Sequence, residues 1–319
     1  MEHGHTHTHD NSHTRNDSHA HGHSHHHSPE LTSVSRSFWI GILLNSIFVV
    51  LEFVTGILTN SLALLSDAGH NLSDVAGLGL SLFAFKISKS RATDKFTYGY
   101  NKSTILASLI NAVVLLIVVG SIGWEAVHRF LQPQETKGNA MAIVAGIGII
   151  INSVSAMLFF RDKEKDLNIK SAYLHLAIDA LVSVTVVIAG LLISYTGIKW
   201  IDPLISLFIM VVVVYSTWGL LKESLFLTLD AVPKNVDVEK IKEAVLKIAE
   251  VKDIHHLHVW AMSTTKNSMT AHLILDEFLT DHQVEEVKNK VRHKLGHMNI
   301  QHLTLETEKQ VCKDENCQT

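Results

Sequence analysis

Six long stretches of mostly apolar residues follow a polar first segment. They occupy residues 37–59, 62–86, 104–131, 139–160, 171–195 and 200–221. Each is close to the roughly twenty residues that an α-helix needs to cross a bilayer. Short polar breaks separate the stretches, and most of the tryptophans lie towards their ends, as at a membrane surface. The pattern predicts a membrane domain of six transmembrane helices over residues 36–222.

The pattern changes after residue 222, where apolar residues recur at the spacings of short amphipathic elements. A helix is predicted by one apolar stripe, formed by Val238, Ile241, Val245 and Ile248. Strands are predicted over residues 251–262, 268–275 and 300–307. Thr280 and Gln283 have the spacing of a capping box, which would open a second helix over 280–295. The order α-β-β-α-β predicts a small cytoplasmic α+β domain over residues 223–309, with its helices on one face of a sheet.

Both ends of the chain are polar. Residues 1–35 contain eleven of the 22 histidines, interspersed with Gly, Ser and Thr, which predicts a disordered cytoplasmic tail that binds divalent metal weakly. A purely solubilising tail or an expression tag is the alternative. Residues 310–319 form a second flexible tail that holds both cysteines, Cys312 and Cys317, so no disulfide framework is expected within the folded body.

Basic residues are concentrated in two of the polar breaks. They are Lys86, Lys89, Arg91, Lys95 and Lys102 after the second stretch, and Arg161, Lys163, Lys165 and Lys170 after the fourth. Because loops rich in Lys and Arg stay on the cytoplasmic side, both breaks and both termini are expected there. The short loops favour a bacterial cytoplasmic (inner) membrane over a eukaryotic organelle.

The second and fifth stretches each carry a histidine and an aspartate four residues apart, His70 with Asp74 and His175 with Asp179. On a helix this spacing places both side chains on one face, about one turn apart. Ionisable groups are costly at membrane depth and are therefore functional candidates there. Two imidazoles and two carboxylates make a complete tetrahedral ligand set for zinc. A purely structural pair of hydrogen bonds is the less favoured interpretation, because the pattern occurs twice.

These residues and their surroundings resemble the cation diffusion facilitator family, in its cobalt–zinc–cadmium efflux and zinc transporter branch. The matching stretches are Ser61–Asp74, Tyr98–Asn101, Tyr173–Ala180, Ile201–Leu204 and His255–Trp260. The resemblance implies a homodimer in the lipid bilayer that exports a divalent cation in exchange for protons, by alternating access at His70, Asp74, His175 and Asp179. A histidine at position 70 implies a preference for zinc, with cobalt and cadmium as alternatives.

The resemblance also implies a ferredoxin-like, metallochaperone-like cytoplasmic domain with its own zinc ion, structural or regulatory. Its ligands would be His255, His272 and Glu308, completed by the tail cysteines Cys312 and Cys317 of the partner protomer. The cysteines are spaced more widely than the usual Cys-x-x-Cys. The resemblance has one further departure, because Lys102-Ser-Thr104 stands where an Arg-x-Glu step is usual, so no carboxylate role is carried over to that position.

Other functions remain as alternatives. A passive metal channel, an importer or a membrane-bound metal sensor would use the same ligands. A membrane-bound metalloenzyme is less favoured, because the His-Glu-x-x-His motif is absent, and the chain has no Gly-rich ATP-binding loop. No enzymatic activity and no nucleic-acid partner are expected. Two further acidic residues keep open roles: Glu52 carries protons or ties helices together, and Asp67 supports the ligands or lines a water path.

Overall fold

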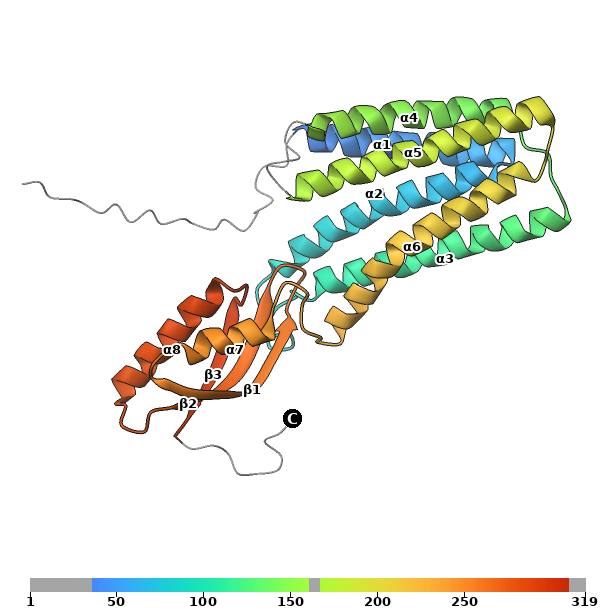
Figure 1. The fold of residues 1–319 in the computed structure, drawn as a ribbon. Coiled ribbons are helices and arrows are strands. Elements are labelled where there is room, and N and C mark those ends of the chain that lie inside the picture. The colour runs from blue at the N-terminus through green and yellow to red at the C-terminus, as the bar shows by residue number, and fades with distance from the viewer. Residues whose placement is uncertain (1–35, 161–166, 310–319) are drawn as a thin grey trace, which may run out of the picture.

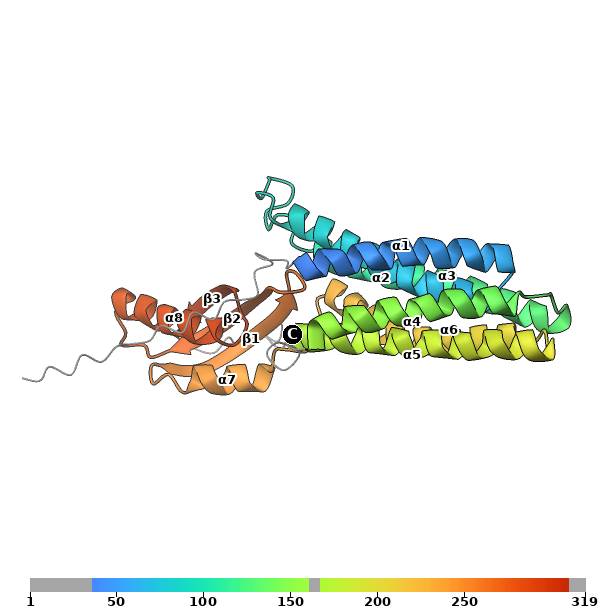
Figure 2. The same cartoon turned by 90° about the horizontal axis from the view of Figure 1, so that it is seen from above.

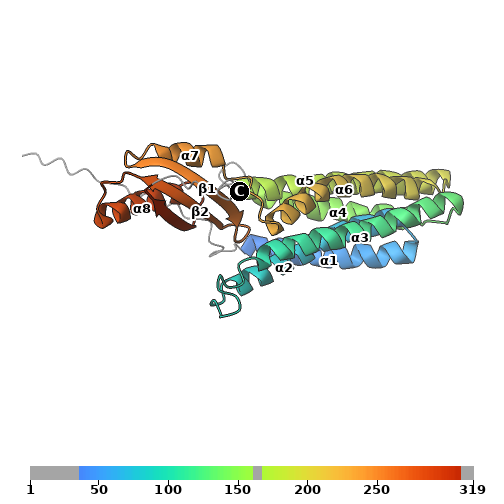
Figure 3. The same ribbon diagram turned by 90° about the horizontal axis from the view of Figure 1, so that it is seen from below.

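The computed structural model describes residues 36–160 and 167–309. Six long helices lie side by side in one bundle, and a smaller unit of helices and strands lies at one end of it (Figures 1 to 3). The bundle helices are α1 (Arg36–Thr59), α2 (Leu62–Ser88), α3 (Ser103–Leu131), α4 (Gly138–Phe160), α5 (Leu167–Thr196) and α6 (Ile201–Thr228). The predicted tails, 1–35 and 310–319, lie outside the described residues.

Four of these helices are long and apolar enough to cross a bilayer: α3, α6, α4 over Gly138–Met157 and α5 over Tyr173–Thr196. The described apolar part of α1 is shorter, Leu43–Thr59. Helix α2 is long, but the charged and polar residues that it carries among its apolar ones lower its hydropathy. The bundle has a buried apolar core, to which all six of its helices contribute: Phe48, Leu64, Val119, Met141, Val186 and Ile209. Large apolar side chains are also exposed on its outside, as a hydrocarbon solvent allows.

The start of α2 is held by a fully buried carboxylate from α6. Asp202 Oδ1 accepts hydrogen bonds from Ser61 Oγ (2.7 Å) and Ala63 N (3.2 Å), and its Oδ2 accepts one from Leu62 N (2.8 Å). Arg129 Nη1 of α3 lies 3.9 Å from the same Oδ2. Because the first N–H groups of a helix have no partner within the helix, this anion stabilises the end of α2. Three helices are thereby joined about two turns before His70.

The smaller unit has the predicted order α-β-β-α-β, which is confirmed: α7 (Val238–Leu246), β1 (Val251–Ala261), β2 (Asn267–Leu275), α8 (Asp281–Gly296) and β3 (His302–Glu308). The sheet order is β1-β2-β3, with β1 and β2 antiparallel and β2 and β3 parallel. The predicted capping box of Thr280 and Gln283 is present. Helices α7 and α8 share a hydrophobic core with the sheet, to which β2 contributes Met269, Ala271 and Leu273. Because side chains alternate along a strand, His272 points to the opposite face.

Several element ends differ from the prediction. Helix α6 continues to Thr228 instead of stopping at 221, and the predicted domain boundary between 222 and 223 therefore falls inside it. No residue in this part breaks the helix until Asp230, which adopts a positive φ of 58°. The last strand begins at His302, two residues later than predicted, after Asn299 at φ 64°. Helix α7 ends at Leu246, so Ile248 is buried beyond the helix.

The loop that follows α2 touches the smaller unit. Lys102 Nζ forms an ion pair with Asp230 Oδ1 at 2.7 Å, just after α6. The backbone N–H of Thr264 donates to Thr104 Oγ1 at 3.1 Å, and the rings of Tyr98 and His302 lie 5.4 Å apart. The loop between α2 and α3 and the first turn of α3 thus contact the smaller unit and the segment that leads into it.

Candidate metal centres

The four residues predicted within the membrane domain meet at one point between α2 and α5. Each histidine faces both aspartates: His70 Nε2 lies 3.6 Å from Asp74 Oδ2 and 3.4 Å from Asp179 Oδ1. His175 Nε2 lies 3.2 Å from Asp74 Oδ2 and 3.6 Å from Asp179 Oδ2. We call this group the quartet. Its four ligand atoms lie within 4.8 Å of one another.

The size of the quartet fits a small tetrahedral ion. Zinc binds imidazole nitrogen and carboxylate oxygen at about 2.0–2.2 Å, which separates neighbouring ligand atoms in a tetrahedron by roughly 3.3–3.5 Å. The four histidine–aspartate separations, 3.2 to 3.6 Å, agree with that spacing. The two imidazole rings are 5.8 Å apart and inclined at 76°, so they do not stack on each other. The residues present could hold one such ion with little rearrangement.

One side of the quartet is closed and the other is accessible. The side chains of Asp179 and His70 are 3% and 13% exposed, whereas those of Asp74 and His175 are 36% and 44% exposed. A metal ion at the quartet would therefore have Asp74 and His175 on its exposed side and Asp179 on its buried side. Two carboxylates also offset the charge of a divalent ion, which lowers the cost of holding it at membrane depth.

The two acidic residues with open roles are both fully buried beside the quartet. Asp67 lies one turn before His70 on α2, and Glu52 comes from α1. Ser183 Oγ donates to Asp67 Oδ2 at 3.3 Å, and Asn71 Nδ2 donates to Glu52 Oε2 at 3.2 Å. The sequence signal for them was the same as for the quartet, namely ionisable residues inside apolar helices.

The candidate ligands of the smaller unit also come together, on the face of the sheet opposite its helices. The strand register pairs His255 with His272 across β1 and β2, and His272 with Glu306 across β2 and β3. Glu308 Oε1 lies 2.6 Å from His272 Nδ1, and its Oε2 lies 3.3 Å from His255 Nε2. These three side chains offer ligand atoms within 4.8 Å of one another. Cys312 and Cys317, the predicted completing ligands, lie outside the described residues.

Two neighbours of this cluster were not among the predicted ligands. Glu306 Oε2 lies 3.4 Å from His272 Nε2. His256 has its ring centroid 4.9 Å from that of His272, although adjacent strand residues normally point to opposite faces. The reason is an irregularity in β1 between His255 and His258, where His256 adopts a φ of 47°. A bulge of this kind is not visible in the sequence pattern.

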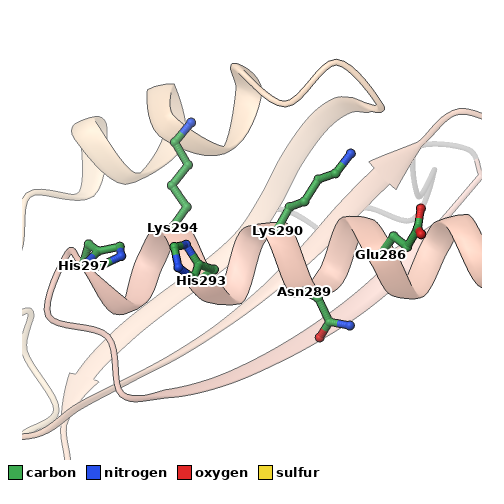
Figure 4. Close-up of a pocket in the computed structure, with 6 residues that line it drawn as sticks. All are labelled: Glu286, Asn289, Lys290, His293, Lys294 and His297. Atoms are coloured by element: carbon green, nitrogen blue, oxygen red, sulfur yellow. The ribbon is translucent and has the colours of Figure 1, made fainter. Parts of the chain in front are cut away.

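A third feature is an open hollow along α8, lined by residues of that helix and by its C-cap residue His297 (Figure 4). Its lining residues are Glu286, Asn289, Lys290, His293, Lys294 and His297. The rings of His293 and His297 lie 4.8 Å apart. Two lysine side chains occupy the same surface, and their charge opposes binding of a metal cation. The hollow therefore adds no metal centre to the two described above.

Comparison with known protein families gives the same division of the chain. The family described as "Cation efflux transmembrane domain" matches residues 38–227, and "Cation efflux protein, cytoplasmic domain" matches residues 233–309. The chain belongs to the cation efflux family. It is therefore an integral membrane protein, whose membrane domain contains the quartet and whose cytoplasmic domain contains the second cluster.

Known members of the cation efflux family match most of the chain. The cadmium, cobalt and zinc/H(+)-K(+) antiporter of Bacillus subtilis (strain 168) is 34% identical over 271 residues, which cover 84% of this chain and 87% of that protein. The zinc transporter ZitB of Escherichia coli (strain K12) is 36% identical, covering 85% and 86%. The cation efflux system protein CzcD of Alcaligenes sp. (strain CT14) is 36% identical, covering 87% and 88%.

Proposed function

We propose that this protein exports a divalent metal cation, zinc first, through the quartet and in exchange for protons. The observation that carries the proposal is the geometry of His70, Asp74, His175 and Asp179, whose spacing fits a tetrahedral ion of the size of zinc. The names of the similar proteins, zinc transporter and cadmium, cobalt and zinc antiporter, support this substrate class. Cobalt and cadmium are secondary substrates, because tetrahedral N/O sites select metals mainly by geometry and availability.

Coupling to protons follows from the ligands themselves. Imidazole and carboxylate bind metal only when they are deprotonated, so protons and metal compete for the quartet. When the site faces the cytoplasm the metal binds, and when it faces the other side protons displace the metal. This alternating access requires helices α2 and α5 to change their exposure to the two sides. The accessible side, lined by Asp74 and His175, is the route of entry in the present conformation.

We further propose the finer arrangement of the chain in the membrane. All six bundle helices cross the bilayer, including α1 and α2, with both termini and the cytoplasmic domain on the cytoplasmic side of a bacterial inner membrane. The functional division is the membrane domain from α1 to the end of α6 at Thr228, the cytoplasmic domain that follows it up to residue 309, and the two tails 1–35 and 310–319. Two copies form a homodimer, aided by the cytoplasmic domain.

The cytoplasmic cluster is proposed to bind a zinc ion of structural or regulatory use. His255, His272 and Glu308 offer three ligands, and a structural zinc site normally has four. Cys312 and Cys317 would supply the remaining ligand from the partner protomer. We expect the double variant Cys312→Ser with Cys317→Ser to bind fewer zinc ions per protein while transport remains measurable.

The test of the transport site is zinc flux into proteoliposomes driven by a pH gradient. Asp74→Ala and Asp179→Ala should each abolish pH-driven zinc accumulation, because each removes one of only four ligands. Asp94→Ala, in the exposed loop after α2, is the matched control and should transport as wild type does. Wild-type transport by either quartet variant would refute the proposal.

The same vesicles separate the transporter from the other candidates. An antiporter accumulates zinc against its concentration gradient when the proton gradient is imposed, and stops when the gradient is collapsed. A passive channel or importer would only equalise zinc on both sides, and a sensor would not move it. A competition series of zinc against cobalt, cadmium and manganese on the purified protein would rank the metals.

A further inference from the structure

We propose that Glu52 and Asp67 form a separate proton-binding site, which holds one shared proton and releases it when a divalent metal occupies the quartet. The inference rests on the proposed transport function and adds to it a proton carrier that is not a metal ligand. It starts from two carboxyl groups that are fully buried in the bundle, one on α1 and one on α2.

The two carboxyl groups lie within hydrogen-bonding contact of each other. Glu52 Oε2 is partnered by Asn71 Nδ2 and Asp67 Oδ2 by Ser183 Oγ, at 3.2 and 3.3 Å. The remaining oxygens, Glu52 Oε1 and Asp67 Oδ1, are buried and have no donor among the described residues. An ionised carboxylate only accepts hydrogen bonds, so two ionised carboxylates in contact repel each other and have no donor between them. One proton between them supplies the missing donor for both.

A proton fits this contact better than a metal ion does. A hard cation such as Mg²⁺ needs about six oxygen ligands, and Ca²⁺ six to eight. The pair offers two carboxyl groups already in direct contact, flanked by an amide N–H₂ and a hydroxyl that both act as donors. Two carboxylates that share one site ordinarily hold one proton between them, because both cannot ionise at contact distance.

The position of the pair couples it to the quartet. Asp67 lies three residues before His70 on α2, and its partner Ser183 lies four residues after Asp179 on α5. The pair is therefore about one helical turn from the quartet along both helices. No described hydrogen bond or ion pair joins Glu52 or Asp67 to a quartet residue, so the pair is a neighbour of the metal and not a ligand.

The charges around the pair are few. Besides its own members, the groups that act on it are His70 of α2 and Asp179 of α5. Helix α4 also packs against α1 and contains no titratable residue. Helices α3 and α6 pack against α2, but their buried groups there, Arg129 and Asp202, lie at the start of α2. The arrival of a divalent cation at the quartet is thus the largest change in charge that the pair experiences, and it favours loss of the shared proton.

The exchange balances without any further reactant. The metal enters the quartet as a divalent cation, and the quartet gives up whatever protons its ligands hold. The pair then releases one more proton as its shared O–H bond breaks, which leaves Glu52 and Asp67 both ionised beside the bound cation. When the metal leaves, one proton returns to the pair.

The experiment counts protons released per zinc ion bound, with the full-length protein purified in detergent, weak buffer and a pH-indicator dye. Glu52→Gln and Asp67→Asn each replace one carboxyl group by a neutral amide, and each should release about one proton fewer per bound zinc than wild type. The swapped pair, Glu52→Asp combined with Asp67→Glu, keeps both carboxyl groups and should restore the wild-type count. Unchanged proton release in either folded single variant would overturn the proposal.

A second measurement needs no variant to fold. The infrared difference spectrum of wild type with and without zinc should show loss of the C=O stretch of a protonated carboxyl group on zinc binding. Absence of that band in the zinc-free protein, or its persistence after zinc binds, would overturn the proposal. Failure of the proposed transport site is recognised separately. In that case Asp74→Ala would bind as much zinc as wild type does, whatever the proton count.

Discussion

Replacement of Asp202 by alanine tests whether the buried carboxylate holds the start of α2 in place. Asp202 is fully buried and accepts hydrogen bonds from one hydroxyl and two backbone N–H groups, at 2.7, 2.8 and 3.2 Å. Arg129, itself only 8% exposed, lies 3.9 Å away and donates to the carbonyl oxygen of Asn60 at 2.6 Å. Asp202→Ala removes the acceptor of Ser61, Leu62 N and Ala63 N at once, and it leaves the buried guanidinium of Arg129 with only the half-exposed Glu125 as a counter-charge.

The magnitude follows from these contacts. Hydrogen bonds to a charged group contribute about 1.5–3 kcal/mol each, and breaking a buried ion pair by removing one partner costs about 3–5 kcal/mol. The contributions are not additive, because Ser61 also caps Leu64 N at 3.2 Å and the helix end can recruit water. We therefore expect Asp202→Ala to lower the free energy of unfolding of the bundle by about 3–5 kcal/mol. Asp202→Asn keeps the size and one acceptor oxygen and should cost less.

The assay is equilibrium unfolding of the purified protein in mixed micelles, followed by the loss of helical circular dichroism. Glu125→Ala is the matched control, since Glu125 also pairs with Arg129, at 3.2 Å, but its side chain is 46% exposed. An exposed pair is worth about 0–1 kcal/mol. If Asp202→Ala were no more destabilising than Glu125→Ala, the carboxylate would not be what holds α2, and the reasoning would fail.

Three further changes test the packing and the cytoplasmic domain. Gly190→Ala should destabilise the bundle by about 1–3 kcal/mol in the same assay, because the added Cβ would lie 2.6 Å from a carbonyl oxygen of α4. Gly146→Ala is the control: its Cβ would meet open space, and it should change the stability by under about 0.5 kcal/mol. Thr280→Ala removes the capping box of α8 and should lower the stability of the cytoplasmic domain by about 1 kcal/mol, read from Trp260 fluorescence during thermal unfolding. The hydrogen bond from Lys290 holds the pKa of Glu250 below its usual value. The small stabilisation that this pair gives the folded domain is therefore present at neutral pH and is lost as the pH falls through the lowered pKa. Glu250→Gln should remove this part of the acid dependence of the melting temperature, and high salt should shrink it in wild type, since the pair is exposed; an equal acid dependence in both proteins would contradict the assignment.

Much of the cytoplasmic domain could be predicted because its signals are local. The stripe through Ile241 and Val245 and the capping box at Thr280 each lie within a few residues, and all three strands were located to within two residues at each end. The contact of His272 with Glu308, two residues that are 36 apart in the chain, depends on the parallel pairing of β2 with β3. The bulge that turns His256 towards His272 has no local signature either.

The sequence by itself determined the six apolar stretches and the four residues of the quartet. The length of an apolar stretch, the four-residue spacing of a histidine and an aspartate, and the cost of a charged residue in hydrocarbon can each be judged from a short segment. Only the tertiary structure decided that α2 and α5 bring His70, Asp74, His175 and Asp179 to tetrahedral spacing. It also decided that Glu52 meets Asp67 and that Asp202 holds the start of α2 from a distance of 140 residues. Such contacts join helices whose mutual packing is set by the shapes of whole faces, and no short window of the chain contains that information.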